Sequence, residues 1–121
     1  MVTKTRVSID EFLAMPETEP PSELIDGEVI QKPMPNDDHG ELAGWLIGKL
    51  FIHLEKLGYG RVKPEVRHAD RNEGWVYLPD IEVRLAPRTS GRGSSAPVEG
   101  PPDMAIEVLS PTTGRDDCSN A

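Results

Sequence analysis

The sequence predicts an α/β or α+β domain with a mixed sheet, and three observations lead to this prediction. A short capped segment at residues 8–14 and a long amphipathic segment at about residues 39–57 predict two helices. An Asp-Gly pair between two small apolar runs predicts a β-hairpin over residues 23–30. Apolar runs at about residues 75–85 and 103–109 predict further strands. Helices and strands in this order favour a mixed sheet packed against helices.

The first helix is predicted from its capping pattern. Ser8 and Glu11 stand three residues apart, which is the spacing of a capping box, and Pro16 follows the helix and stops it. After an acidic, proline-rich connector, Asp26-Gly27 separates two short apolar runs. This dipeptide is the strongest short-range sequence signal for a hairpin, so we expect the turn there.

The longest predicted helix runs from His39 to about Leu57, after possible N-cap residues at positions 36–38. Its apolar residues recur with the helical period and form one wide stripe: Leu42, Ala43, Leu46, Ile47, Leu50, Phe51 and Leu54. A wide apolar face of this kind is typical of a helix packed on a sheet. Gly58 and Gly60 are expected to terminate the helix.

Two strand regions are expected after this helix. Residues 61–67 alternate like a half-buried strand, and Pro64 favours a position at the edge of the sheet. Residues 75–85 are largely apolar and are interrupted by Pro79-Asp80. The sequence therefore predicts a second strand region with a break in its middle.

The C-terminal part combines a loop with a buried strand. Residues 86–102 are rich in Arg, Gly, Ser and Pro and predict a mobile loop. Residues 103–109 form a near-continuous apolar run, which is suited to the middle of a sheet. The chain has 121 residues and no internal repeat, so we expect a single domain over residues 1–121.

Composition and charge limit the function classes. The formal net charge is −8 and the pI about 4.8, which argues against a protein that coats DNA by charge alone. An enzyme whose acidic pocket is neutralised by a divalent metal ion is still allowed. The single cysteine, Cys118, excludes an internal disulfide, and no apolar run approaches the ~20 residues of a membrane-spanning helix. We expect a cytoplasmic protein without membrane contact.

Two carboxylates stand in unusual settings. Asp80 follows Pro79 at the break in a strand region, and Glu107 lies inside the last apolar run. If their strands pair so that the two side chains lie ~5 Å apart, the repulsion is roughly 3 kcal/mol at an effective dielectric of ~20. Either one carboxylate carries a proton or a cation lies between them, and hard oxygen ligands suit Mg²⁺ or Mn²⁺. The alternative interpretation is a turn aspartate and a strand glutamate that points to solvent.

Four segments, in this order, carry a resemblance to a known family: Glu23-Leu-Ile-Asp-Gly-Glu28, His39 at a helix start, Leu78-Pro-Asp-Ile81, and Pro102-Asp-Met-Ala-Ile-Glu-Val-Leu-Ser-Pro111. The chain resembles the Uma-type branch of the PD-(D/E)XK nuclease superfamily from about residue 8 to residue 117. The resemblance implies a restriction-endonuclease-like fold, with a central mixed sheet flanked by helices. It implies that Asp80 and Glu107 are catalytic carboxylates that bind divalent metal, and that His39 and Glu28 are further candidate catalytic residues near the pocket.

Two departures from the family pattern bear on activity. The signature lysine would stand at position 109, which is Leu109 here, and no lysine follows Lys63 to replace it from a later helix. Arg115 is the only basic residue after the last strand, and a guanidinium cannot readily serve as a base. The chain also ends soon after Ser110-Pro111, which predicts a C-terminally truncated member of the family. Exposed apolar surface and an open strand edge would then favour a homodimer.

Three interpretations of function follow from these observations. The first is a metal-dependent endonuclease that hydrolyses phosphodiester bonds of DNA, with the role of the missing lysine unfilled or supplied by a partner chain. The second is a catalytically degenerate nuclease fold that acts as a binding or assembly module. The third is a fragment without an independent role.

Overall fold

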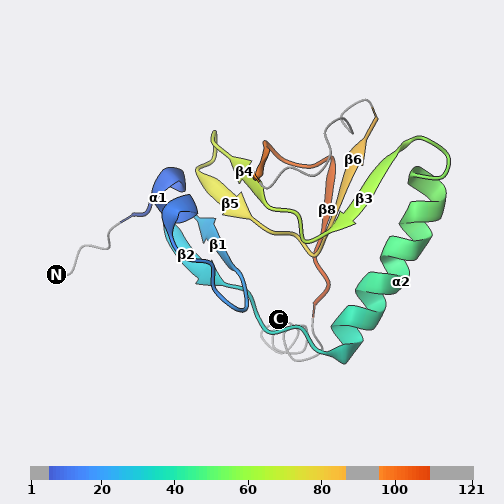
Figure 1. The fold of residues 1–121 in the computed structure, drawn as a ribbon, viewed down its shortest axis with the longest axis horizontal. Coiled ribbons are helices and arrows are strands. Elements are labelled where there is room, and N and C mark those ends of the chain that lie inside the picture. The colour runs from blue at the N-terminus through green and yellow to red at the C-terminus, as the bar shows by residue number, and fades with distance from the viewer. Residues whose placement is uncertain (1–5, 87–95, 110–121) are drawn as a thin grey trace, which may run out of the picture.

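The computed structural model describes residues 6–86 and 96–109, which form two helices and two sheets (Figure 1). In chain order the elements are α1 (Ile9–Ala14), β1 (Ser22–Ile25), β2 (Glu28–Gln31), α2 (Asp37–Leu54), β3 (Gly60–Pro64), β4 (His68–Asp70), β5 (Trp75–Tyr77), β6 (Ile81–Leu85), β7 (Val98–Glu99) and β8 (Met104–Ile106). The larger sheet has the order β2-β1-β5-β4-β7 and the smaller one the order β3-β6-β8. The β4–β7 pair is parallel and the other pairs are antiparallel, so the predicted α/β class with a mixed sheet is confirmed.

The N-terminal helix and hairpin form as the sequence predicted. The Glu11 backbone N–H donates to the Ser8 hydroxyl and the Ser8 backbone N–H donates to the Glu11 carboxylate, both at 3.1 Å. These two bonds complete the capping box at the start of α1. Asp26 and Gly27 have φ angles of 51° and 78°, as a tight hairpin turn requires, and they join β1 to β2.

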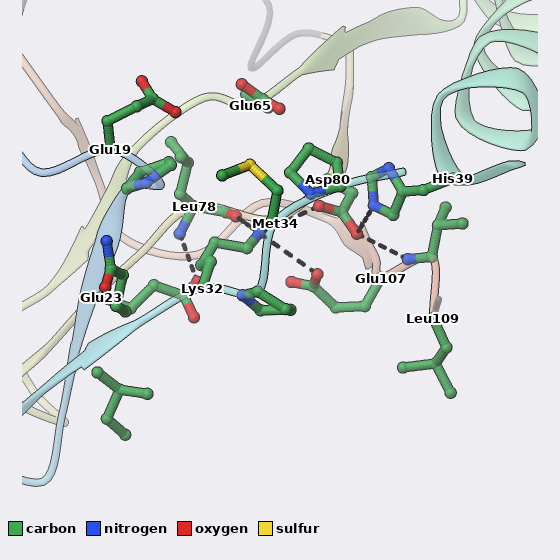
Figure 2. Close-up of a pocket in the computed structure, with 16 residues that line it drawn as sticks. Glu19, Glu23, Lys32, Met34, His39, Glu65, Leu78, Asp80, Glu107 and Leu109 are labelled. Carbon is green, nitrogen blue, oxygen red and sulfur yellow. Dashed lines mark hydrogen bonds and ion pairs between the residues drawn. The ribbon is translucent and has the colours of Figure 1, made fainter. Parts of the chain in front are cut away.

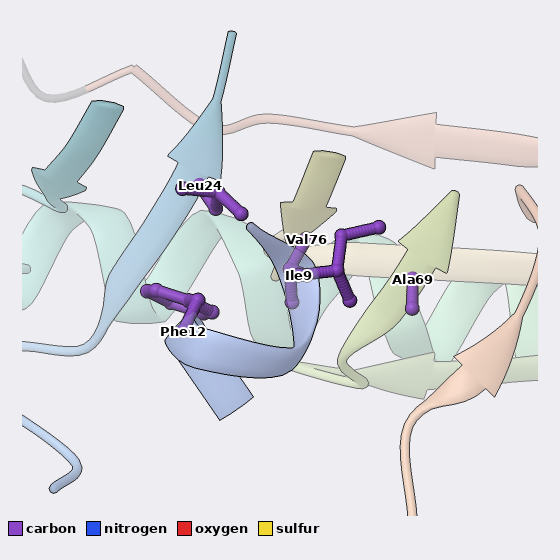
Figure 3. Close-up of a cluster of buried hydrophobic side chains, with 5 residues drawn as sticks. All are labelled: Ile9, Phe12, Leu24, Ala69 and Val76. Carbon is purple, nitrogen blue, oxygen red and sulfur yellow. The ribbon is translucent and has the colours of Figure 1, made fainter. Parts of the chain in front are cut away.

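Helix α1 covers the larger sheet through a small apolar core (Figure 3). Ile9 and Phe12 of α1 contact Leu24 of β1, Ala69 of β4 and Val76 of β5. The three strand residues have no solvent exposure. This core joins α1 to three strands that are distant in sequence, so it fixes the position of the β1–β2 hairpin.

Helix α2 differs from its predicted limits at both ends. It begins at Asp37, because the Asn36 side chain accepts a hydrogen bond from the His39 backbone N–H at 2.8 Å and caps the helix. It ends at Leu54 rather than Leu57, in a turn closed at Gly58, whose φ is 78°. Neither helix in the described part of the chain has the length and apolar character needed to cross a membrane.

The apolar stripe of α2 packs on the smaller sheet, as predicted. Five helix residues contact the buried cluster of that sheet: Ala43, Leu46, Ile47, Leu50 and Leu54. Leu42 and Phe51, which the periodicity placed on the same stripe, are instead 47% and 49% exposed. They lie on the two sides of the stripe, where the helix surface faces solvent rather than the sheet.

The predicted region 75–85 is divided between the two sheets. β5 pairs with β1 and β4 in the larger sheet, and β6 pairs with β3 and β8 in the smaller one, so the chain crosses between them at Pro79-Asp80. Strand β3 lies at the edge of the smaller sheet, as Pro64 predicted. The sequence did not predict β4, or β7 within the expected loop 86–102, and residues 87–95 of that loop lie outside the described residues.

The prediction that residues 103–109 form a buried strand in the middle of a sheet is wrong. β8 spans only Met104–Ile106 and pairs with β6 on one side, and no strand pairs with its other edge within residues 6–86 and 96–109. Met104 is 53% exposed, whereas Ile106 and Val108 contact the core beneath α2. An apolar run favours a buried strand, but it does not determine whether another strand pairs alongside.

Candidate functional site

An acidic pocket lies where the segment after β2, the start of α2, the β5–β6 connection and the end of β8 meet (Figure 2). The cavity has a volume of about 380 Å³. Five carboxylate residues line it: Glu19, Glu23, Glu65, Asp80 and Glu107. Lys32 and His39 also line it. Negative charge gathered in this way favours the binding of a cation.

Strand register brings the two predicted carboxylates together. Ile81 is paired with Ile106 in the antiparallel β6–β8 ladder. The next positions in this register are 80 and 107. Asp80 and Glu107 therefore follow the last paired residues of the two neighbouring strands.

Asp80 is held as an ionised carboxylate. Its Oδ2 accepts hydrogen bonds from the Val108 backbone N–H at 2.8 Å and from His39 Nε2 at 3.1 Å, and its Oδ1 accepts one from Lys32 Nζ at 3.1 Å. Burial alone would raise the pKa of Asp80, but the bonds from Val108, His39 and Lys32 outweigh it and lower the pKa. Asp80 therefore carries a fixed negative charge at neutral pH.

Glu107 has the opposite shift. Burial raises the pKa of Glu107 to about 7; Lys32 opposes this shift, and the charge of Asp80 adds to it. Its Oε2 lies 3.5 Å from Lys32 Nζ, and half of its side chain is exposed. Glu107 therefore holds its proton up to about neutral pH beside the ionised Asp80. A further cation in the pocket would stabilise the charged form of Glu107.

Lys32 lies one residue after β2, and its ammonium contacts both carboxylates. Nζ is 3.1 Å from Asp80 Oδ1 and 3.5 Å from Glu107 Oε2, and it also donates to the backbone carbonyl of Leu78. Burial alone would lower the pKa of Lys32, but Glu107, Asp80 and Glu23 outweigh it and raise the pKa. The ammonium is therefore charged, and both carboxylates contact it.

Three of the four residues predicted from the sequence lie in the acidic pocket: Asp80, Glu107 and His39. His39 reaches Asp80 from the first turn of α2, which the Asn36 cap holds in place. The structure does not bring Glu28 to the pocket. Glu28 lies at the turn end of β2, whereas Lys32 follows the opposite end of that strand.

Sequence reasoning missed Lys32 and Glu23. The signature lysine was sought after the second acid, but Lys32 stands 48 positions before Asp80 and reaches the pocket from the hairpin. Glu23 lines the pocket from β1 and accepts a hydrogen bond from the Leu78 backbone N–H at 2.8 Å. The sequence pattern that could have indicated Lys32 was weak: Lys32 stands directly before Pro33, at the end of a strand that begins with a family motif.

A second acidic group lies at the start of α2. Carboxylate oxygens of Asp37, Asp38 and Glu41 lie within 4.8 Å of one another, and all three residues are exposed. Acidic side chains in the first turn of a helix interact favourably with the helix dipole. This position explains the group without a bound ion.

The mixed α/β fold and the two carboxylates at neighbouring strand ends define a restriction-endonuclease-like protein. The family profile described as "Uma2: Putative restriction endonuclease" matches residues 9–119, and the chain belongs to this family. It is similar to a crystal structure from Anabaena variabilis described as "a putative nuclease belonging to DUF820", with 32% identity and a TM-score of 0.77. The similarity covers 94% of this chain but only 64% of that one. Among curated proteins, none matches the sequence. Both the family and the Anabaena variabilis structure are thus described as putative nucleases.

Proposed function

We propose that this chain is a metal-dependent endonuclease that hydrolyses phosphodiester bonds of DNA, with Asp80 and Glu107 as the ligands of Mg²⁺ or Mn²⁺. One observation carries the proposal: both carboxylates contact a single cation, the Lys32 ammonium, at 3.1 Å and 3.5 Å. Membership of a restriction-endonuclease family supports the class of reaction.

The donor set of the acidic pocket fits these ions. Mg²⁺ and Mn²⁺ prefer oxygen ligands, and two carboxylates with one shared cation position supply them. Burial, with a contribution from the charge of Asp80, raises the pKa of Glu107 to about 7, and a divalent ion beside Glu107 would stabilise its charged form. The half-exposed Glu107 side chain leaves a path for the ion to enter. When bound, such an ion would polarise a phosphoryl oxygen and lower the pKa of water.

The chain's own groups have supporting roles in this proposal. Val108 N–H and His39 donate to Oδ2 of Asp80 and thereby fix the orientation of its carboxylate. Lys32 supplies an ammonium in the same pocket that can donate a hydrogen bond to a phosphate oxygen. The lysine that is absent after the second acid therefore has a candidate replacement within this chain, which removes the need for a partner chain.

Nicking of supercoiled plasmid DNA with Mg²⁺ or Mn²⁺ tests the proposal. We expect activity from the unmodified protein and from Glu73→Gln, a control that removes a negative charge at the exposed turn between β4 and β5, outside the residues that line the pocket. Asp80→Asn and Glu107→Gln should each lose roughly 100-fold or more, since even groups that only support metal ligands contribute about 10–100-fold. Equal nicking by all four proteins would dispose of the proposal.

A catalytically degenerate binding or assembly module is the second candidate function. It is favoured by the Lys32 ammonium, which already compensates the charge of both carboxylates without a metal ion. Calorimetry with Mn²⁺ separates the two candidates. An endonuclease should give binding heat that Glu107→Gln abolishes, whereas a degenerate site should give none.

We also propose that the protein forms a homodimer. Support comes from strand β8, whose outer edge pairs with no strand in the described part of the chain, and from the exposure of Met104 and Leu109 beside it, 53% and 58%. An open edge flanked by apolar side chains favours self-association. Light scattering over a range of concentrations should give the mass of a dimer; a monomer at every concentration would contradict the proposal.

A further inference from the structure

The Lys32 ammonium stands where a shared metal ion would be expected. It contacts one oxygen of Asp80 and one oxygen of Glu107, the same two groups that the proposed function assigns as metal ligands (Figure 2). The side chain is only 13% exposed, so its charge is held inside the acidic pocket rather than in bulk water. The two carboxylates are therefore already neutralised in part by a residue of the chain itself.

We propose that Lys32 is a built-in counter-cation that competes with the divalent ion for Asp80 and Glu107 and thereby sets the metal affinity of the acidic pocket. This inference rests on the proposed function. The ammonium holds the two carboxylates together before metal binds, and it must leave the space between them when metal binds.

Charge and distance require this competition. A bound Mg²⁺ lies roughly 2.0–2.1 Å from its oxygen ligands, so an ion shared by the two carboxylates would enter the space in front of oxygens that now contact Lys32 Nζ. Two like-charged groups this close repel strongly in a partly desolvated pocket. Metal binding therefore includes the free energy needed to break the contacts of Lys32 with Asp80 and Glu107.

The side chain of Lys32 is suited to moving aside. A lysine carries a compact charge on a flexible four-carbon stem, unlike the rigid planar guanidinium of arginine. The Leu78 carbonyl already accepts a hydrogen bond from the ammonium, and the charge of Glu23 also stabilises it. The displaced ammonium thus has partners in the pocket other than the two metal ligands.

Titration with Mn²⁺ measures the competition without any activity assay. Free Mn²⁺ is followed by electron paramagnetic resonance, for the unmodified protein, Lys32→Met, and Lys56→Met as a control that removes an exposed lysine elsewhere. We expect Lys32→Met to bind Mn²⁺ about tenfold or more tightly than the unmodified protein, which corresponds to about 1.4 kcal/mol or more. Lys56→Met should match the unmodified protein. Mn²⁺ should also raise the melting temperature of Lys32→Met by more than that of the unmodified protein.

Two results would overturn the inference, and they can be told apart. If the unmodified protein binds Mn²⁺ and Glu107→Gln abolishes this binding, but Lys32→Met binds equally or more weakly, the competition is refuted and the proposed function stands. If neither protein binds Mn²⁺, both proposals fail. Should Lys32→Met not fold, Lys32→Gln provides the same measurement, because it also removes the positive charge but keeps a polar side chain.

Discussion

Replacing Asp80 with asparagine keeps the size of the side chain but removes the charge that organises the acidic pocket. The amide oxygen can still accept the hydrogen bond from Val108 N–H, whereas Lys32 and His39 lose a charged acceptor. A hydrogen bond to a charged group contributes about 1.5–3 kcal/mol, and removing one partner of a buried ion pair costs about 3–5 kcal/mol. Because the side chains of Lys32 and His39 keep 13% and 14% exposure, water compensates part of the loss. We therefore expect a loss of about 3 kcal/mol in the free energy of unfolding.

Urea denaturation at neutral pH without divalent ions measures this loss. The unmodified protein, Asp80→Asn and the exposed control Glu73→Gln are compared under identical conditions, with the slopes of the transitions checked for equality. Glu73→Gln should stay within about 0.5 kcal/mol of the unmodified protein. A loss below about 1 kcal/mol for Asp80→Asn would refute the argument that its hydrogen bonds to Lys32 and His39 are strong.

Three further changes have defined outcomes. Leu24→Ala, at a fully buried core position, should lower the free energy of unfolding by about 3 kcal/mol, and a loss under about 1 kcal/mol would contradict the core in Figure 3. Ser8→Ala removes the α1 cap and should cost about 1 kcal/mol in the same urea assay, whereas no change would show that the cap is unimportant. Burial raises the pKa of Glu107 from 4.5 to about 7, so between these pH values the folded protein holds a proton that the unfolded chain has released. This contribution to stability is present below pH 4.5 and is lost as the pH rises through about 7. The urea midpoint of the unmodified protein should therefore fall over this range relative to Glu107→Gln, and parallel curves would contradict the shift.

Elements that depend on local sequence were predicted well. The Ser8–Glu11 capping box, the Asp26-Gly27 turn and the apolar period of α2 each specify their element within a few consecutive residues. Strand pairing depends on partners distant in sequence. β4 was missed because His68–Asp70 has no apolar alternation and is a strand only by pairing with β5 and β7.

The candidate site shows the same difference between local sequence patterns and contacts distant in sequence. Asp80, Glu107 and His39 were found because they belong to motifs that the family resemblance identifies in the sequence. Their proximity depends on the β6–β8 register, which no local pattern specifies. Lys32 was missed because its role depends on the hairpin lying beside the β5–β6 connection, and nothing in the residues around Lys32 indicates this contact.

Anomalous diffraction from crystals grown with Mn²⁺, at a pH above the pKa of Glu107, tests most directly whether Asp80 and Glu107 share one cation. We expect an anomalous peak within coordination distance of both carboxylates, with the Lys32 ammonium moved away from between them. No peak at that position, or a peak only beside Asp37, Asp38 and Glu41, would contradict this expectation.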